Sequence, residues 1–449
     1  MLALPPDILS FLLPFSTLFS APVWKNALVL ILGAILAKGK RTVTSALRYM
    51  GHKNEANFPK YHWVLSHAKW SSLNAAKILL GLLVKLIPNK MVTLVIDETL
   101  ERRKGKKIKA NGKYRDAVRS TQTKAVTCFG LKWLTLTILI KFSWSNRRWA
   151  LPFMTILEPS EKCDKASNRK HKSSIKWSIQ ALKQVKRWLS GYSITVLGDG
   201  GFATALFCWE CIKLNVSLVS RLRIDARLYD FPAERLPGSK GRPAKKGTRL
   251  MSFKEMVEIE DAGWVEAVIC GYEGKSTKVQ YLTNTALWHV EGFEPAPIRW
   301  VLVVDPTGKR GPIPLFSTDV NLSAQCIIEL YVERWSIEVT FEEVRAHLGV
   351  ETQRQWSDGA IARTTPALMG LFSLTCLMAN SMLQGKELEK GGAAWYRKDQ
   401  GTYSDVLTLI RKELWRWKSL NGFAEKGVNG EKADRGMVDW LIDMLGSAA

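Results

Sequence analysis

The stretch Val92-Thr-Leu-Val-Ile-Asp-Glu-Thr99 decides the fold class, because five β-branched or aliphatic residues lead directly into two carboxylates. Such a run predicts a buried strand. A second apolar run, 194–197, leads in the same way into Gly198-Asp199-Gly200-Gly201. Ligands bind at the carboxyl ends of the strands in α/β sheets. We therefore predict an α/β fold in which Asp97 and Asp199 lie at one functional edge.

The other sequence patterns place helices at both ends of the chain and short strands in its middle. Residues 1–88 are predicted to form a small helical unit, and the last fifty residues to form polar helices. Residues 217–316 alternate short apolar runs with Gly- and Pro-rich turns, which we interpret as a mostly β insertion. The expected helices are 28–36, 42–49, 71–87, 173–189, 202–214, 324–348 and 360–383, and the expected strands are 92–96, 125–130, 131–142, 194–197, 217–222, 264–270, 279–283 and 300–304.

The positive charge of the chain is concentrated in three clusters. The 449 residues include 65 Lys and Arg against 41 Asp and Glu, a formal charge of +24, which excludes an acidic binding protein. Residues 102–124 contain ten basic residues and one acid, residues 162–187 nine and one, and residues 236–249 five and none. Clusters of this kind are typical of surfaces that bind polyanions, and nucleic acid is the first candidate. A solvated loop is the alternative for any single cluster.

The cysteines and the apolar runs favour an intracellular protein. Seven cysteines are too few, and odd in number, for a disulfide framework. Cys208 and Cys211 form a C-x-x-C pair without a second pair of zinc ligands, so we predict that both are buried helix residues. The apolar run 27–37 is shorter than the roughly 20 residues of a membrane span and is predicted to be a buried helix. The first residues do not have the pattern of a signal peptide, so no export is expected.

A third acid comes from the predicted helix 324–348, in the segment YVERWSIEVTFEEVR. Tyr331, Arg334, Glu338 and Arg345 are spaced by three, four and seven residues, which predicts that they project from one helix face. Trp335 and Phe341 flank that face and are expected to anchor the helix to the sheet. The alternative for each single acid is a strand-end cap or an ordinary surface residue.

Asp97, Asp199 and Glu338 together form a hard, oxygen-rich set of ligands, which suits Mg²⁺ or Mn²⁺. Two such ions can activate a water or a DNA 3′-hydroxyl for attack on a phosphodiester and stabilise the leaving oxygen. Rival ligands lie nearby in the sequence. Glu98 is expected on the opposite side of its strand from Asp97, and Glu342, one turn past Glu338, is expected to support the site; Glu343 is the third rival.

At these residues the sequence resembles a known family, the DDE transposases of bacterial insertion sequences, in the group with a Tyr-x2-Arg-x3-Glu-x6-Lys signature. Here the signature residues are Tyr331, Arg334, Glu338 and, in the Lys position, Arg345. The similar strings are VIDET at 95–99, LGDGGFA at 197–203, STD at 317–319 and YVERWSIEVTFEEVRAHLG at 331–349. The resemblance covers about residues 20–385.

The resemblance implies an RNase H-like catalytic domain with Asp97, Asp199 and Glu338 as ligands of two Mg²⁺ or Mn²⁺ ions. It also implies cutting at terminal inverted repeats and strand transfer into target DNA by a homodimeric synapse. The expected organisation is a helical DNA-binding domain at 1–88, a catalytic domain at 89–216 and 317–385, a β-rich insertion at 217–316 and a helical region at 386–449. A cytoplasmic protein, associated with the bacterial nucleoid when bound to DNA and with no membrane partner, fits this reading.

Several further residues are predicted to contact DNA. Tyr331, Arg334 and Arg345 are expected to hold phosphates, and the basic clusters supply Arg102, Arg103, Lys104, Lys106, Lys107, Arg242, Lys245 and Lys246. Gly241-Arg242-Pro243 resembles peptides that insert an Arg into A·T-rich minor grooves, although a mobile linker explains it equally well. In relatives with such an insertion an aromatic residue stacks on a flipped base, and Trp264, Trp288 and Trp300 are candidates if they are not core residues.

Two other functions remain open from the sequence. A catalytically idle relative would bind repeat ends without cutting them, and a stand-alone endonuclease of the same fold would cut without strand transfer. The presence of all three acids favours the transposase.

Overall fold

The computed structural model describes residues 4–447 except 117, 122, 235–240, 260–262, 272–273, 275, 393–394, 396–397 and 426–434, and for 419–425 and 435–440 it describes the backbone only. By compactness the chain divides into two units. The first contains Met1–Leu86, Glu98–His171 and Val339–Ala449, and the second contains Ile87–Asp97 and Lys172–Glu338. The five-part organisation expected from the sequence stays a prediction.

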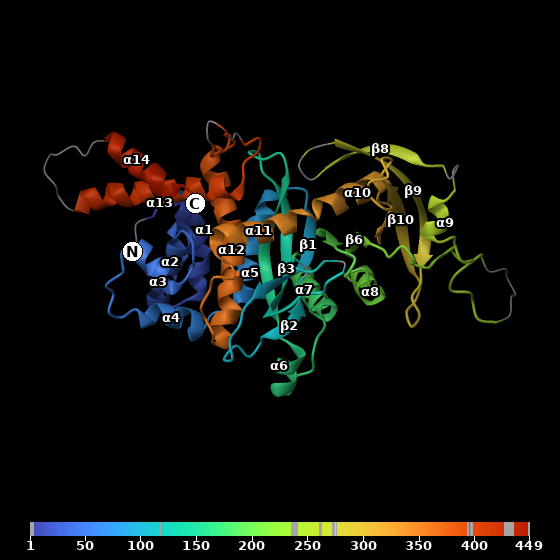
Figure 1. Ribbon diagram of the computed structural model, residues 1–449, viewed down its shortest axis with the longest axis horizontal. Helices are drawn as coiled ribbons and strands as arrows, with labels where there is room; N and C mark the ends of the chain where they lie inside the picture. The colour runs from blue at the N-terminus through green and yellow to red at the C-terminus, as the bar shows by residue number, and fades with distance from the viewer. Residues whose placement is uncertain are drawn as a thin grey trace. The chain divides into compact units, whose positions relative to one another are not determined.

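The first unit begins with a group of short helices (Figure 1). They are α1 (Pro6–Leu12), a 3₁₀ turn η1 (Leu13–Leu18), α2 (Ala21–Leu36), α3 (Val43–Tyr49), α4 (Pro59–Ser66), α5 (Ser72–Leu83) and a second 3₁₀ turn η2 (Val84–Leu86). Thr42 and Ser71 cap α3 and α5 with their side-chain oxygens, as helix N-termini require. Gly33 lets α2 approach α3, because a Cβ there would lie 2.6 Å from the Cβ of Ala46.

Strands and long helices complete the first unit. The strands are β2 (Gly112–Arg115), β3 (Thr127–Lys141), β4 (Arg148–Glu158) and the last part of β1 (Met91–Arg102), and the helices are α6 (Glu161–Ala166), the last part of α11 (Ser336–Leu348), α12 (Asp358–Leu383), α13 (Tyr403–Glu425) and α14 (Arg435–Gly446). β3 pairs antiparallel with both β2 and β4. Helix α12 packs on β4, and Ser373 donates a hydrogen bond to the carbonyl of Pro152.

Two buried arginines hold the C-terminal end of α2. Arg411, on α13, donates to the carbonyls of Ile35 and Ala37 at 2.7 and 2.9 Å. Arg41 donates to the carbonyl of Ala34 and to that of His347. Cations near the last carbonyls of a helix complement its dipole. Burial, with Arg411 nearby, lowers the pKa of Arg41 to about 10.

The second unit is a mixed sheet with helices around it. Its strand order is β1-β5-β6-β11-β10-β9-β7, and β8 pairs with β9. The elements are α7 (Ser174–Trp188), β5 (Ser193–Gly198), α8 (Ala205–Lys213), β6 (Ser217–Arg221), β7 (Leu228–Tyr229), α9 (Phe253–Val257), β8 (Val265–Cys270), β9 (Ser276–Trp288), β10 (Ala296–Val304), β11 (Ile313–Ser317), α10 (Ala324–Glu333) and the first turn of α11.

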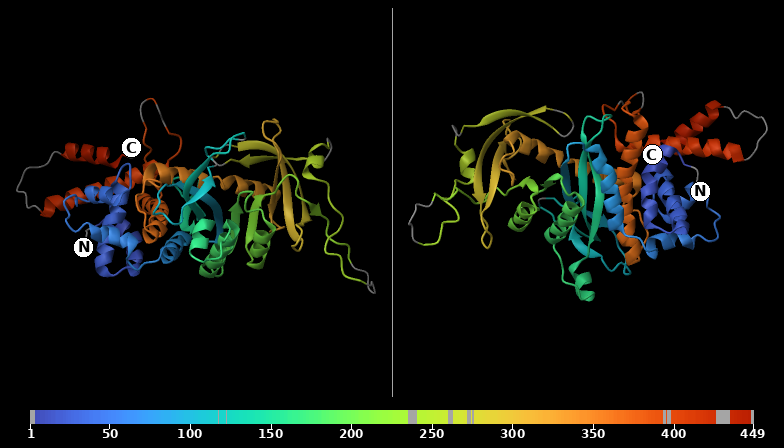
Figure 2. Two further views of the ribbon diagram at one scale, coloured as in Figure 1. Left: turned by 60° about the horizontal axis from the view of Figure 1, so that its bottom comes forward. Right: turned by 180° about the vertical axis from the view of Figure 1, so that it is seen from behind.

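Parallel and antiparallel pairing divide the sheet of the second unit. β1, β5 and β6 are parallel neighbours, whereas β6, β11, β10 and β9 pair antiparallel. β8, β9 and β10 stay side by side in every view (Figures 1 and 2). The chain thus has a mixed α/β fold with a large mixed sheet and helices at both ends, which confirms the predicted fold class.

Several local predictions are confirmed. The run 27–37 forms the last part of α2 and its C-cap residue Ala37, and it buries Leu28, Leu32 and Ile35. Cys208 and Cys211 are buried on α8, and burial raises the pKa of Cys208 to about 12. Within the described residues, α12 is the one helix long and apolar enough to cross a membrane, and 67% of its most apolar window is buried inside the protein, as in a core helix.

Other element boundaries were wrong. β1 does not end at Asp97 but continues to Arg102, and residues 127–141 form one strand instead of two. β4 was not expected from the sequence. The predicted helix 324–348 is two helices, α10 and α11, because the chain tightens at their joint: the amides of Trp335, Ile337 and Glu338 each bond to the carbonyl three residues earlier.

Candidate active site

The first two acids lie next to each other where the parallel pairing of β1 and β5 ends. In the register of β1 and β5, Ile96 is opposite Gly198, so Asp97 and Asp199 occupy the next position along each chain. β6 runs parallel to β5 and ends nearby in sequence at Arg221. β5 and β6 therefore end at one edge, where the pairing of β1 with β5 also stops although β1 itself continues, and this edge is the place where α/β sheets bind ligands.

A tight turn fixes Asp199 after β5. Its Oδ1 accepts a hydrogen bond from the amide of Gly201 at 2.9 Å, and its carbonyl accepts one from the hydroxyl of buried Ser220 at 2.7 Å. A Cβ on Gly198 would lie 2.8 Å from the Cβ of Phe202. Gly198 of the LGDGGFA string thus allows this tight turn, because a larger side chain at this position would clash with neighbouring atoms.

Arg334 connects the third acid to the first. At the joint between α10 and α11 its Nη2 lies 2.9 Å from Oε1 of Glu338, and its Nη1 lies 3.6 Å from Oδ2 of Asp97. The Arg334 side chain is only 11% exposed. Burial works to lower the pKa of Arg334, but Asp97 and Glu338 outweigh it and raise that pKa overall. A buried cation held by two carboxylates stays charged.

Tyr331 brings the second acid into the same site. The guanidinium carbon of Arg334 lies 5.6 Å from the centre of the Tyr331 ring. Burial raises the pKa of Tyr331; the charge of Asp199 adds to this rise, while Arg334 and Arg221 oppose it. Asp97, Asp199, Glu338, Tyr331 and Arg334, all predicted from the sequence, therefore share one electrostatic environment.

Two residues of this site were missed in the sequence. Ser220 orients the carbonyl of Asp199, and Arg221 adds a positive charge near Tyr331. Both lie on β6, which was assigned to the insertion instead of to the parallel strands. The apolar run at 217–219 directly after α8 was the available signal, because a strand after a crossover helix joins the same sheet.

The acids suit a hard cation by their chemistry, since all donors are carboxylate oxygens. In the part of the chain that the structure describes, no three His, Cys, Asp or Glu side chains are gathered closely enough to hold a metal ion. Arg334 supplies the positive charge that faces Asp97 and Glu338 here. Metal ligation by the three acids stays a prediction.

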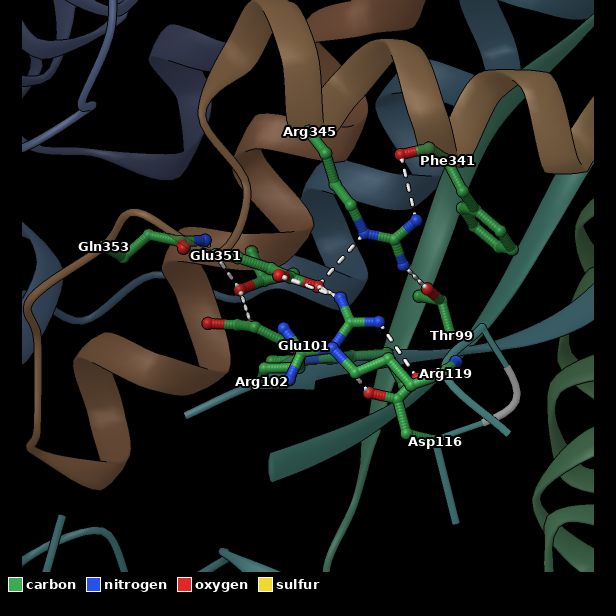
Figure 3. A network of polar contacts seen from close by, with 11 residues as sticks. Thr99, Glu101, Arg102, Asp116, Arg119, Phe341, Arg345, Glu351 and Gln353 are labelled. Carbon is green, nitrogen blue, oxygen red and sulfur yellow. Dashed lines mark hydrogen bonds and ion pairs between the residues drawn. The ribbon is translucent and has the colours of Figure 1, made fainter. Parts of the chain in front are cut away.

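Arg345 lies in a separate polar cluster of the first unit (Figure 3). Its Nε lies 3.1 Å from Oε1 of Glu351, and its Nη2 donates to the hydroxyl of Thr99 at 2.5 Å. Tyr331 is in the last turn of α10 and Arg334 is the residue that caps it, whereas Glu338 and Arg345 are on α11. The expectation that all four project from one continuous helix was therefore wrong, because the joint at Arg334 changes the helix.

The same cluster binds two arginines that were expected to contact DNA. Arg102 forms a fork with Asp116 at 2.7 and 3.0 Å and reaches Glu351 at 3.4 Å (Figure 3). Arg103 pairs with buried Glu101 and donates to the carbonyl of Gln355. Both arginines are thus engaged in ion pairs within the first unit, with the Arg103 side chain almost buried and the Arg102 side chain partly exposed. Lys104, Lys106 and Lys107, by contrast, are exposed.

The third basic cluster is partly described. Residues 235–240 lie outside the described residues. Arg242 is exposed, Lys245 pairs with Glu294, and the Nζ of Lys246 lies 3.9 Å from the centre of the Tyr229 ring. DNA contact by this cluster stays a prediction.

Two of the three proposed base-stacking residues are core residues. Trp288 is 8% exposed and packs on Phe316, and Trp300 is 6% exposed and packs on Phe253. Both rings are buried among core residues, so neither is available to stack on a base. Trp264 is half-buried.

The two aromatic residues that flank the third acid differ in their exposure to solvent. Phe341 is buried, as expected for an anchor, but Trp335 is exposed and does not anchor the helix. Among the rival acids, Glu98 pairs with Lys132 and Glu343 with His347, while Glu342 is exposed.

Comparisons with known proteins identify the family. The family model described as DDE superfamily endonuclease matches residues 14–289, which include Asp97 and Asp199. A solved structure, that of a piggyBac transposase synaptic complex with hairpin DNA, aligns with a TM-score of 0.40 and 9% identity, over 93% of this chain and 74% of that chain. A search of curated proteins finds no match. More than half of the chain matches the family model, and the protein therefore belongs to the DDE superfamily of endonucleases.

Proposed function

We propose that this protein is a transposase that cuts double-stranded DNA at terminal inverted repeats and joins the 3′ ends to target DNA. The observation that carries the proposal is the register of β1 and β5, which sets Asp97 beside Asp199, together with the bond from Arg334 to Glu338. The order of the acids along the chain and the family membership support the same conclusion.

Asp97, Asp199 and Glu338 would hold Mg²⁺ or Mn²⁺, two ions per site, which supply an activated oxygen nucleophile and stabilise the leaving oxygen. The chain's own residues prepare the site. Asp199 is fixed by the amide of Gly201 and by Ser220, so little reorganisation is needed before reaction. Arg334, Arg221 and Tyr331 surround the acids with donors that can position phosphate oxygens.

The proposed partners follow from this reaction. They are the repeat ends, the target DNA and a second copy of the chain, because two ends have to be joined together in one synapse. A cytoplasmic location, with the protein on the nucleoid when DNA is bound, belongs to the same proposal. The stand-alone endonuclease and the idle DNA-binding relative are the competing functions.

The test uses purified full-length protein and a labelled duplex that carries the element's own terminal repeat, with Mg²⁺ or with EDTA. We expect metal-dependent cuts at the repeat boundary that are lost in Asp97→Asn, Asp199→Asn and Glu338→Gln, with DNA binding kept. Glu98→Gln is the matched control, since Glu98 neighbours Asp97 on the same strand but pairs with Lys132; it should cut normally.

Each other outcome assigns a different function. Binding without any cut identifies the idle relative, and cuts without integration of the labelled end into a target plasmid identify the endonuclease. Full activity in one of the three acid variants removes that residue from the site.

A further inference from the structure

Two loops of the first unit present one aromatic ring and several cations to solvent. Trp356 is 58% exposed, and Nζ of Lys107 lies 5.0 Å from the centre of its ring. Lys104 and Lys106, next to Lys107 in the sequence, and Arg354 are exposed as well. We call Trp356, Arg354, Lys104, Lys106 and Lys107 the Trp356 surface.

Buried anchors hold the loop that carries Trp356. Gln353 is buried and donates from Nε2 to the hydroxyl of Thr365 at 3.1 Å. The carbonyl of Gln355 accepts a hydrogen bond from Arg103. The intervening residue Arg354 and the following residue Trp356 are exposed. Buried contacts of Gln353 and Gln355 thus hold the backbone of this loop in place, while the side chains of Arg354 and Trp356 are exposed to solvent.

The lysine loop is held in the same way. Ile108 and Ala110 are buried in a core cluster with Trp133 and Ile361. The amide of Ile108 closes a turn on the carbonyl of Gly105 at 3.2 Å. The exposed lysines therefore lie on or next to an anchored turn, which brings Lys107 to the Trp356 ring. Asp358, two residues after Trp356 in the sequence, pairs with Lys109 at 3.4 Å.

This combination has the chemistry of a site for an unpaired nucleotide. An exposed aromatic face stacks on any base, and lysines around it neutralise the flanking phosphates. Lys107 already places an ammonium over the ring, and its flexible side chain can move from the ring to a phosphate when a base arrives. A surface that is fixed before binding loses little conformational entropy.

We propose that Trp356 stacks on an unpaired DNA base while Lys104, Lys106 and Lys107 hold the adjacent phosphates. This inference rests on the proposed function for its DNA substrate, but it assigns a different residue and a different loop from the insertion tryptophans Trp288 and Trp300.

The test compares two DNA probes with the full-length protein. One is a repeat-end duplex with a single unpaired 2-aminopurine near its end, and the other is the same duplex fully paired. Binding is measured by anisotropy of a distant dye, and stacking by quenching of the 2-aminopurine fluorescence. We expect the wild type to prefer the unpaired probe and to quench it, because aromatic stacking strengthens binding about five- to 150-fold per base.

Trp356→Ala should weaken binding of the unpaired probe about tenfold and remove the quenching, with little change for the paired probe. Trp356→Phe should keep most of both signals, because a phenyl ring still stacks. Trp395→Ala is the matched control, since Trp395 is 90% exposed in the same unit; it should behave as the wild type.

The outcomes separate the inference from the function on which it rests. If Trp356→Ala keeps the preference and the quenching, or weakens both probes equally, the stacking role is wrong while DNA binding stands. If the wild type binds neither probe, the transposase proposal itself fails and the stacking role fails with it.

Discussion

At the scale of single residues, Arg334 connects two of the three acids. Its guanidinium faces Asp97 and Glu338 at 3.6 and 2.9 Å in a mostly buried setting. Removal of one partner from a buried ionic group leaves the other charges uncompensated. Arg334 thus stabilises two carboxylates that would otherwise repel each other across the site.

Substitution Arg334→Ala should lower the cleavage rate at least about a hundredfold, by analogy with the loss of one charge-stabilising donor. The variant should also have a lower Tm than the wild type in EDTA, because Asp97 and Glu338 lose their cation. Added Mg²⁺ should raise the Tm of the variant more than that of the wild type, since a cation that binds the folded state stabilises it.

Arg334→Lys is the matched control, because it keeps the charge and should keep most of the Tm. Calorimetry with and without Mg²⁺ measures these shifts. An equal Mg²⁺ response in Arg334→Ala and the wild type would show that the two carboxylates do not form a cation site.

At the scale of elements, the part of β1 beyond Asp97 connects distant segments of the first unit. The strand continues past Asp97 and places Glu101, Arg102 and the following Arg103 among partners from distant segments. Arg102 ties this strand to the segment after β2 through Asp116 and to the segment after α11 through Glu351. Figure 3 shows these residues converging on one cluster.

The pair Arg102–Asp116 should make stability depend on acid pH. The hydrogen bond from Arg102, against the opposing effect of burial, lowers the pKa of Asp116 from 3.8 to about 2. A carboxyl with a lowered folded-state pKa contributes stability that is present above about pH 4 and is lost as pH falls toward 2. Asp116→Asn should therefore lower the Tm at pH 7 by a few degrees, roughly 2–5 °C.

The Tm difference between Asp116→Asn and the wild type should shrink between about pH 4 and pH 2. Thermal melts at pH 7, 4 and 2.5 measure it, and Asp225→Asn is the matched control, since Asp225 pairs with Arg223 on an exposed surface. A Tm difference that stays constant with pH would contradict the assigned pair.

At the scale of the whole molecule, the net charge of +24 is divided between structural and exposed residues. Arg102 and Arg103 are committed to ion pairs inside the first unit, whereas Lys104, Lys106 and Lys107 face solvent. One basic cluster in the sequence thus contains both kinds of residue. Only the exposed lysines can reach DNA phosphates and release their counterions.

The triple variant Lys104→Gln, Lys106→Gln, Lys107→Gln should weaken binding to all duplex sequences alike. The slope of log affinity against log salt should become shallower by about 0.9 for each lost phosphate contact. Titrations at several salt concentrations give this slope. The control Lys386→Gln, Lys390→Gln changes exposed lysines outside the three basic clusters and should keep the wild-type slope.

An unchanged slope in the triple variant would mean that these lysines do not contact DNA. Arg102→Gln, by contrast, should lower the Tm, because it breaks the two hydrogen bonds between Arg102 and Asp116.

The sequence by itself determined the α/β class, the two apolar strands that lead into Asp97 and Asp199, and the burial of Cys208 and Cys211. These features depend on local periodicity and on the general geometry of α/β sheets, which neighbouring residues encode. The glycine-rich turn after β5 was visible for the same reason, because it needs small residues at fixed positions.

Only the tertiary structure decided which basic and aromatic residues remain available to contact DNA. Arg102 meets Glu351 across 249 residues of sequence, and Arg103 meets Gln355 across 252. Trp288 and Trp300 are buried while Trp356 is exposed, although all three look alike in the sequence. The ion pairs of these arginines and the exposure of these tryptophans depend on contacts between distant segments, which local periodicity does not specify.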